Sequence, residues 1–247
     1  MIIDVHGHLG YDYTFDEDFT LEEHLEKHKD CKVDITILQP GTCHNLQEAV
    51  KEHDAIAEAC KNYPGKFYGM ANPSPHLTDD EYNWEIKRCI EKLGFVGIKI
   101  HPFAHGVNPL SRDGRKVFEI ANYYKVPVMM HTGSGIPFAN PSNLIPIAKQ
   151  YPELKLVFAH CGQMVMAAET VITMELFGNI YADSSWSPGF SIKGWSDKLG
   201  ANRFMLGADH ADNCATELAK LRTSGLSEEQ LDWVLYKTAL EVYGINK

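Results

Sequence analysis

Long hydrophobic runs, paired cysteines and an excess of positive charge are all missing from this chain of 247 residues. No stretch approaches the roughly 20 apolar residues of a membrane span, and the N-terminus shows neither the basic nor the apolar segment of a signal peptide. The six cysteines are scattered, with no Cys-x-x-Cys pair, so the spacing does not indicate a disulfide framework. We therefore expect a cytoplasmic protein whose thiols are reduced.

The formal net charge of −10 argues against nucleic acid or an anionic membrane surface as the main partner. It leaves a small anionic substrate open, because a metal ion and a few cations inside a pocket outweigh a diffuse surface charge. No linker rich in Ser, Gly or Pro divides the chain, so residues 1–247 are expected to form a single domain. A homodimer is a possible oligomeric state, since twofold dimers are the commonest soluble oligomers.

Apolar runs of strand length alternate with helix-like stretches along the whole chain. The runs cover residues 2–5, 35–38, 67–70, 96–100, 126–130, 156–159, 180–182 and 204–207. The helix-like stretches cover residues 48–61, 79–93, 113–124, 143–151, 163–177, 211–223 and 228–242, and Thr78 with Glu81 predicts a capping box at the second of them. Such alternation in about 250 residues is typical of a (β/α)8 TIM barrel, with its active site at the C-terminal ends of the strands.

An open, doubly wound sheet is the structural alternative. Two observations favour the barrel. No Gly-x-Gly-x-x-Gly motif follows the first apolar run, and polar residues suited to a site end the first and the last runs. These two strands must be neighbours in a closed barrel but need not be in an open sheet.

Three histidines and one aspartate end strands that are far apart in the sequence. His6 and His8 are two residues apart on the first strand, so their side chains leave the same face. His131 and Asp209 end the fifth and the eighth runs. Three imidazoles and one carboxylate suit a borderline divalent metal. We predict one metal ion, zinc by preference, held by His6, His8, His131 and Asp209, although manganese or iron would accept the same ligands.

His160 ends the sixth run and is our candidate for the catalytic acid or base, because the ordinary pKa of histidine lies near neutrality. A further metal ligand, or a core histidine bonded to a carbonyl, are the alternatives. Lys99 and His101 share the strand face opposite Ile98 and Ile100, so we expect them to point into the barrel. Lys99 and His101 would bind a substrate carboxylate. Alternatively, Lys99 is carbamylated and bridges two metals, or it reaches solvent at the rim.

Other histidines and aromatic residues give weaker signals. His24, His28, His44, His53 and His76 lie in helical or loop stretches and are expected to be solvated. Three aromatic residues after the seventh run would either form a wall of the pocket or pack a long loop: Trp186, Phe190 and Trp195.

Taken together, these motifs resemble the amidohydrolase superfamily, in particular the amidohydrolase-related branch that includes aminocarboxymuconate-semialdehyde decarboxylase. The resemblance spans the chain through Ile3-Asp4-Val5-His6-Gly7-His8, Gly97-Ile98-Lys99-Ile100-His101-Pro102, Val128-Met129-Met130-His131-Thr132-Gly133, Ala159-His160-Cys161-Gly162, Tyr181-Ala182-Asp183 and Leu206-Gly207-Ala208-Asp209. It implies metal ligation by His6, His8, His131 and Asp209, and implies that His160 orients or deprotonates a metal-bound water. The family usually shows Gly-Ser-Asp where this chain has Gly207-Ala208-Asp209, a change that spares the carboxylate.

The function we expect is a metal-dependent hydrolase that attacks a small, carboxylate-bearing amide, lactone or ester with an activated water. His160 and Asp209 would carry the proton. A non-oxidative decarboxylase is the alternative, because it needs the same ligands and the same base. A barrel that binds a ligand without chemistry is a third hypothesis, and the intact ligand set argues against it.

Overall fold

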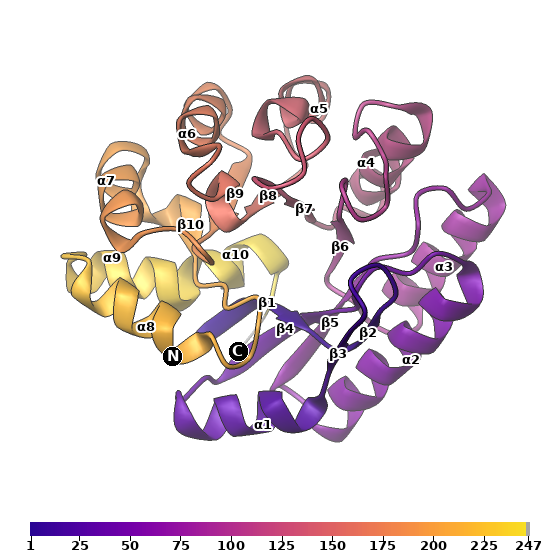
Figure 1. Cartoon of the computed structure of the whole chain (residues 1–247), viewed down its shortest axis with the longest axis horizontal. Coiled ribbons are helices and arrows are strands. Elements are labelled where there is room, and N and C mark those ends of the chain that lie inside the picture. Colours follow the sequence, from indigo (N-terminus) through magenta and orange to yellow (C-terminus); the bar gives the residue numbers. More distant parts are fainter. Residues whose placement is uncertain (246–247) are drawn as a thin grey trace.

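The computed structural model describes residues 1–245, and within them eight parallel strands form one sheet in sequence order. The strands are β1 (Ile3–His8), β4 (Ile35–Gln39), β5 (Phe67–Ala71), β6 (Gly97–Ile100), β7 (Val128–His131), β8 (Leu156–Ala159), β9 (Ile180–Asp183) and β10 (Phe204–Met205). The first and last strands meet, because the Val5 N–H donates to Leu206 O at 3.0 Å and the Asp209 N–H donates to His6 O at 2.7 Å. The predicted (β/α)8 barrel is therefore confirmed, and the open sheet is excluded (Figure 1).

Helices surround the strands, as Figure 1 shows. They are α1 (Leu21–Asp30), α2 (Leu46–Asn62), α3 (Asp79–Glu91), α4 (Arg112–Tyr124), η1 (Pro141–Leu144), α5 (Ile145–Gln150), η2 (His160–Gly162), α6 (Ala167–Leu176), α7 (Gly189–Leu199), η3 (Ala201–Arg203), α8 (Cys214–Thr223), α9 (Glu228–Asp232), η4 (Trp233–Lys237) and α10 (Thr238–Tyr243). Thr78 and Glu81 form the predicted capping box of α3. Helices α1 and α7 lie outside the helix-like stretches of the sequence. Within residues 1–245, none of these helices is long and apolar enough to cross a membrane.

Apolar side chains pack in two layers on the two faces of the sheet. Ile3, Ile35, Ile37 and Met129 belong to a cluster inside the barrel. A larger cluster, which contains Ile98 with many helix residues, lies between the sheet and the helices. Both faces are thus buried, which explains why the strands are continuous apolar runs rather than alternating ones.

A bulge in β1 decides which way its histidines point. Ile3 pairs with Ile35, but the register shifts before Gly7 pairs with Leu38, so β1 has one residue more than β4 in this interval. Val5 still packs inside the barrel. Because the bulge inserts one residue, His6 and His8 turn to the same interior face as Val5 instead of to the helices.

A short hairpin after β1 lies against the site histidines. It consists of β2 (Gly10–Asp12) and β3 (Glu17–Phe19), which pair in antiparallel fashion. Its Phe15 and Phe19 rings lie 5.7 Å from the His101 ring and 5.2 Å from the His8 ring. Neither segment is an apolar run, so the sequence predicts no strand here.

Candidate functional site

Three of the four predicted metal ligands bring their donor atoms together at the barrel mouth. His6 Nε2 lies 3.1 Å from Asp209 Oδ1 and 3.3 Å from His8 Nε2, and His8 Nε2 lies 3.3 Å from Asp209 Oδ1. Within the described residues, these three side chains form a group whose donor atoms could hold one metal ion. The group joins the first strand of the barrel to the segment after the last one.

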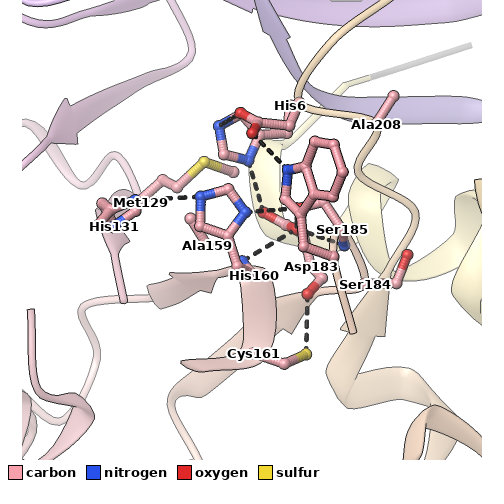
Figure 2. A network of polar contacts seen from close by, with 12 residues as sticks. His6, Met129, His131, Ala159, His160, Cys161, Asp183, Ser184, Ser185 and Ala208 are labelled. Atoms are coloured by element: carbon pink, nitrogen blue, oxygen red, sulfur yellow. Dashed lines mark hydrogen bonds and ion pairs between the residues drawn. The ribbon is translucent and has the colours of Figure 1, made fainter. Parts of the chain in front are cut away.

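Asp183, at the end of β9, fixes the ring of His6 (Figure 2). The His6 Nδ1–H donates to Asp183 Oδ2 at 2.9 Å, and both side chains are fully buried. With its proton held on Nδ1, His6 presents the lone pair of Nε2 to the group formed with His8 and Asp209. Metal-binding histidines commonly depend on such a carboxylate partner.

Asp183 also organises the base of the site through its other oxygen. Oδ1 accepts the His160 N–H at 3.2 Å and the Ser185 N–H at 3.0 Å, and it contacts the Ser185 hydroxyl. The sequence places Asp183 only in the motif Tyr181-Ala182-Asp183 and predicts no role for it. The available signal was its position, because it ends an apolar run just as the other site residues do.

His131 and His160 meet beside this group rather than within it. His160 Nε2 lies 3.1 Å from His131 Nδ1, and His160 Nδ1 lies 2.7 Å from Ser185 Oγ. The His131 Nε2–H donates to the Ser134 carbonyl at 2.9 Å, since a carbonyl can only accept. In this arrangement both ring nitrogens of His131 lie within hydrogen-bond distance of protein atoms. Its role as a ligand stays a prediction.

The buried lysine of the site approaches a predicted ligand. Lys99 Nζ lies 2.9 Å from His6 Nε2 and 3.7 Å from the sulfur of Met129. Its neighbours Ile98 and Ile100 pack outward, as expected. His101, by contrast, stacks on the ring of His131 with centroids 3.9 Å apart.

Burial controls the protonation states of the site. It holds the pKa of His6 and His160 well below the ordinary value and lowers the pKa of His131 to about 4. Burial also lowers the pKa of Lys99 to about 8. For Asp209, burial by itself would raise the pKa, but His6 and His160 outweigh it and hold the pKa well below the usual range. Neutral imidazoles and an ionised carboxylate are the forms that bind a metal ion.

A buried ion pair supports the strand that carries the ligands. Lys27 of α1 donates to Asp4 Oδ2 at 2.8 Å, and Asp4 Oδ1 accepts the N–H groups of His6 at 3.0 Å and Ala208 at 2.9 Å. His24 Nε2 lies 2.6 Å from the His8 carbonyl. These bonds fix the backbone of β1 against both α1 and the segment after β10.

Three histidines that were expected to be solvated are held in buried hydrogen-bond networks instead. His24, His28 and His53 are buried, not solvated, with exposed fractions of 1%, 7% and 0%. His53 Nδ1 is bonded to Glu85 at 2.6 Å in a second buried polar cluster between α2 and α3. The sequence could not separate these residues from surface histidines, because their partners come from distant segments.

Of the three aromatic residues after the seventh run, Trp186 contacts the site directly. Its indole N–H donates to Asp209 Oδ2 at 2.6 Å, and its ring meets His210 edge-on. Phe190 is exposed, whereas Trp195 of α7 is partly buried and stacks on Phe204 of β10. Trp186 therefore orients the carboxylate of a predicted ligand.

A cavity of about 190 Å³ opens over these groups. Its size suits a molecule with a single ring. The residues that line it come from the ends of several strands and from the hairpin: His6, His8, Asp12, Phe15, Glu17, Phe19, Lys99, His101, His131, His160, Gln163, Asp209 and His210. All the predicted site residues are among them.

The donor set fits a divalent metal ion. Two imidazole nitrogens and one carboxylate oxygen suit zinc or manganese. The His6 Nε2 lone pair faces the group and is contacted by Lys99, and the buried Nδ1 of His8 has no partner among residues 1–245. The ionised carboxylate of Asp209 beside the neutral imidazole of His6 also carries a negative charge that a bound cation would balance.

A family model described as Amidohydrolase matches residues 3–245 of the chain. Among curated proteins, a sequence search finds no match.

Solved structures with the same fold are numerous, and the three described next share less than 20% sequence identity with this chain. A 5-carboxyvanillate decarboxylase from Sphingomonas paucimobilis has 15% identity and a TM-score of 0.81, with 99% of each chain covered. A dihydroxybenzoic acid decarboxylase from Polaromonas sp. JS666, with bound manganese and the inhibitor 2-nitroresorcinol, has 15% identity and a TM-score of 0.80, covering 100% of this chain and 97% of that one. A 4-oxalomesaconate hydratase from Rhodopseudomonas palustris has 18% identity and a TM-score of 0.76, covering 99% and 96%.

Proposed function

This chain belongs to the amidohydrolase family, and we propose that it is a metal-dependent decarboxylase of a small hydroxylated aromatic acid. The observation that carries the proposal is the convergence of donor atoms from His6, His8 and Asp209 beside the buried amine of Lys99. Two of the structurally similar proteins named above are decarboxylases of aromatic acids. They favour decarboxylation over the hydrolysis that we expected first.

Manganese is as good a candidate as zinc for this site. The decarboxylase from Polaromonas holds manganese, and the ligand types accept either ion. His6, His8 and Asp209 would hold the ion. His131 would join them as a fourth ligand if it gave up its hydrogen bond to the Ser134 carbonyl. When bound, the ion would supply a positive charge that withdraws electron density from a substrate oxygen.

Decarboxylation needs a cation that binds the carboxylate and a group that donates a proton, and the residues around the cavity fit both requirements. Lys99 is the one lysine or arginine that lines the cavity within the described residues, so it would bind the carboxylate. His160 lies between His131 and Ser185. It is neutral in the free protein, so it would take up a proton from solvent when the anionic substrate binds, and would then deliver that proton to the ring carbon that bears the carboxylate. The carbon–carbon bond then breaks, its electron pair stays with the ring, and carbon dioxide leaves.

The first test of this function uses 2,6-dihydroxybenzoate, of which 2-nitroresorcinol is the nitro analogue. The protein loaded with manganese or zinc is expected to release carbon dioxide and 1,3-dihydroxybenzene in equal amounts. His160→Gln is expected to lose at least about 100-fold in turnover while it keeps its metal. His44→Gln, which changes an exposed histidine, is the matched control and should retain activity. Full turnover in His160→Gln would refute the role of this residue.

A hydrolase is the second candidate, and the family name itself favours it. The same donor atoms would serve an activated water, with Lys99 and His101 steadying the carboxylate of an amide, lactone or ester. A panel of such compounds, followed for acid production without carbon dioxide release, distinguishes this activity from decarboxylation.

A further inference from the structure

The cavity over the candidate metal ligands has little apolar surface. Within residues 1–245, all but two of the residues that line it carry polar or charged side chains, and the two exceptions are Phe15 and Phe19. Both belong to the hairpin after β1, since Phe19 ends β3 and Phe15 lies in the turn between β2 and β3. We call these two side chains the hairpin wall. The apolar part of a ligand in this cavity would find its apolar contact there.

Neither phenylalanine of the hairpin wall serves the core of the protein. The Phe15 side chain is 44% exposed, and within residues 1–245 neither residue belongs to the two apolar clusters on the faces of the sheet. The Phe15 ring is inclined by 55° to the His101 ring, and the Phe19 ring by 33° to the His8 ring, so neither is stacked face to face on these histidines. Apolar surface that remains open at a cavity is available to a ligand.

The hairpin holds Phe15 in place before any ligand binds. Asp12 Oδ1 accepts the N–H groups of Thr14 at 2.8 Å and of Phe15 at 2.9 Å. Asp12 Oδ2 accepts the Thr42 N–H at 2.8 Å, which ties the hairpin to the loop after β4. Because the backbone of Phe15 is already ordered, a ring that packs on its side chain costs little further conformational entropy.

The depth of the cavity brings a ring to the hairpin. Lys99 lies within β6, one residue before the strand ends, and is 2% exposed. The hairpin follows the end of β1 and therefore lies farther out, at the barrel mouth. A substrate whose carboxylate binds Lys99 has the rest of its molecule directed toward the mouth. The hairpin wall is the apolar surface that it meets there.

Building on the proposed function, we propose that Phe15 and Phe19 bind the face of the substrate ring and make the site prefer an aromatic acid to an acid without a ring. Lys99 would bind the carboxylate at the inner end of the cavity, and the hairpin wall would hold the ring at the outer end. Phe15 and Phe19 are thus specificity residues that carry no proton. Aromatic rings in contact attract each other beyond the burial of their apolar area, which adds to this preference.

The test compares an aromatic acid with an acid that has no ring. Manganese-loaded His160→Gln protein is the parent, because it is expected to bind 2,6-dihydroxybenzoate without turnover. Calorimetry gives its Kd for 2,6-dihydroxybenzoate, and competition against this ligand gives its Kd for acetate. Phe15→Ala, added to the parent, should weaken binding of 2,6-dihydroxybenzoate about tenfold, because the ring loses its apolar and aromatic contact. Acetate reaches only the groups that bind the carboxylate, so its Kd should change by less than about twofold.

The matched control is Phe103→Ala, which removes another exposed phenylalanine, on the loop after β6, that is not among the residues lining the cavity in the described part of the chain. It should leave both dissociation constants unchanged. Phe15→Leu is the second variant if Phe15→Ala folds poorly. It keeps an apolar side chain but has no flat ring, and should weaken binding of 2,6-dihydroxybenzoate about threefold.

Three results would overturn the inference while the proposed function stands. The first is a Kd for 2,6-dihydroxybenzoate that changes by less than about twofold in both Phe15 variants. The second is an equal weakening of both ligands, because the wall would then act on the carboxylate and not on the ring. The third is a loss of manganese affinity of more than about twofold in Phe15→Ala, which would mean that Phe15 supports the metal ligands. If the metal-loaded parent binds neither acid, the proposed function fails and the ring preference fails with it.

Discussion

Replacing Asp183 by Asn should weaken metal binding although Asp183 touches no metal. Oδ2 of Asp183 accepts the His6 Nδ1–H, and Oδ1 accepts two backbone N–H groups, from His160 and Ser185. Asparagine has the same shape but only one acceptor oxygen. Whichever way its amide turns, its NH₂ group faces either the imidazole or the two backbone donors.

The expected loss of metal affinity follows from the two possible orientations of the asparagine amide. If the NH₂ group faces His6, the imidazole must move its proton to Nε2 and loses the lone pair that the metal needs. If it faces the backbone, buried donors oppose each other, which costs about 1 to 3 kcal/mol. Loss of such a carboxylate partner typically weakens metal binding about 10- to 100-fold, equivalent to about 1.4 to 2.8 kcal/mol.

The assay is competition for manganese against a fluorescent chelator, at neutral pH, on wild type and Asp183→Asn. Asp54→Asn is the control, since Asp54 is an exposed carboxylate paired with Arg88 away from the barrel mouth. It should leave Kd unchanged. A Kd for folded Asp183→Asn within about twofold of wild type would refute the argument that Asp183 sets the tautomer of His6.

Three further changes test the support of the site. Lys27→Met leaves Asp4 buried without its partner and should destabilise the fold by about 3 to 5 kcal/mol, measured by urea denaturation; Asp4→Asn in the same chain should restore part of the loss. Gly7→Ala places a Cβ 2.7 Å from a methyl group on β4 and should cost about 1 to 3 kcal/mol in the same assay, and a neutral result would disprove the close packing. Burial alone would raise the pKa of Glu85, but hydrogen bonds, chiefly from Arg88, lower it to about 2. Its stabilisation is complete above about pH 4.5 and is lost as the pH falls toward 2, so the stability difference between wild type and Glu85→Gln should shrink over that range; a difference independent of pH would contradict this pKa.

The strands were predictable because apolar runs in a buried parallel sheet need no distant information. Each of the eight runs overlaps an observed strand, and the residues that end them lie at the barrel mouth. The closure of the barrel also followed from the sequence. His6 and Asp209 had to be neighbours if they were to share an ion, and their segments are joined by a backbone hydrogen bond.

The rest of the site depends on features that a sequence pattern does not carry. Simple alternation from Ile3 would send His6 and His8 to the helices, and only the bulge turns them inward. The role of Asp183 depends on its hydrogen bond to His6, which precedes it by 177 residues in the sequence. The buried state of His24 likewise depends on the carbonyl of His8, so its position in a helix did not reveal it.

Metal content of the purified protein tests the account most directly. Wild type and His6→Ala, without added metal and after reconstitution with manganese or zinc, are analysed by inductively coupled plasma mass spectrometry. The account predicts close to one equivalent in wild type and a large loss in His6→Ala. About two equivalents would contradict the single-ion site and favour a carbamylated Lys99. The absence of bound metal in reconstituted wild type would contradict the metal-dependent mechanism itself.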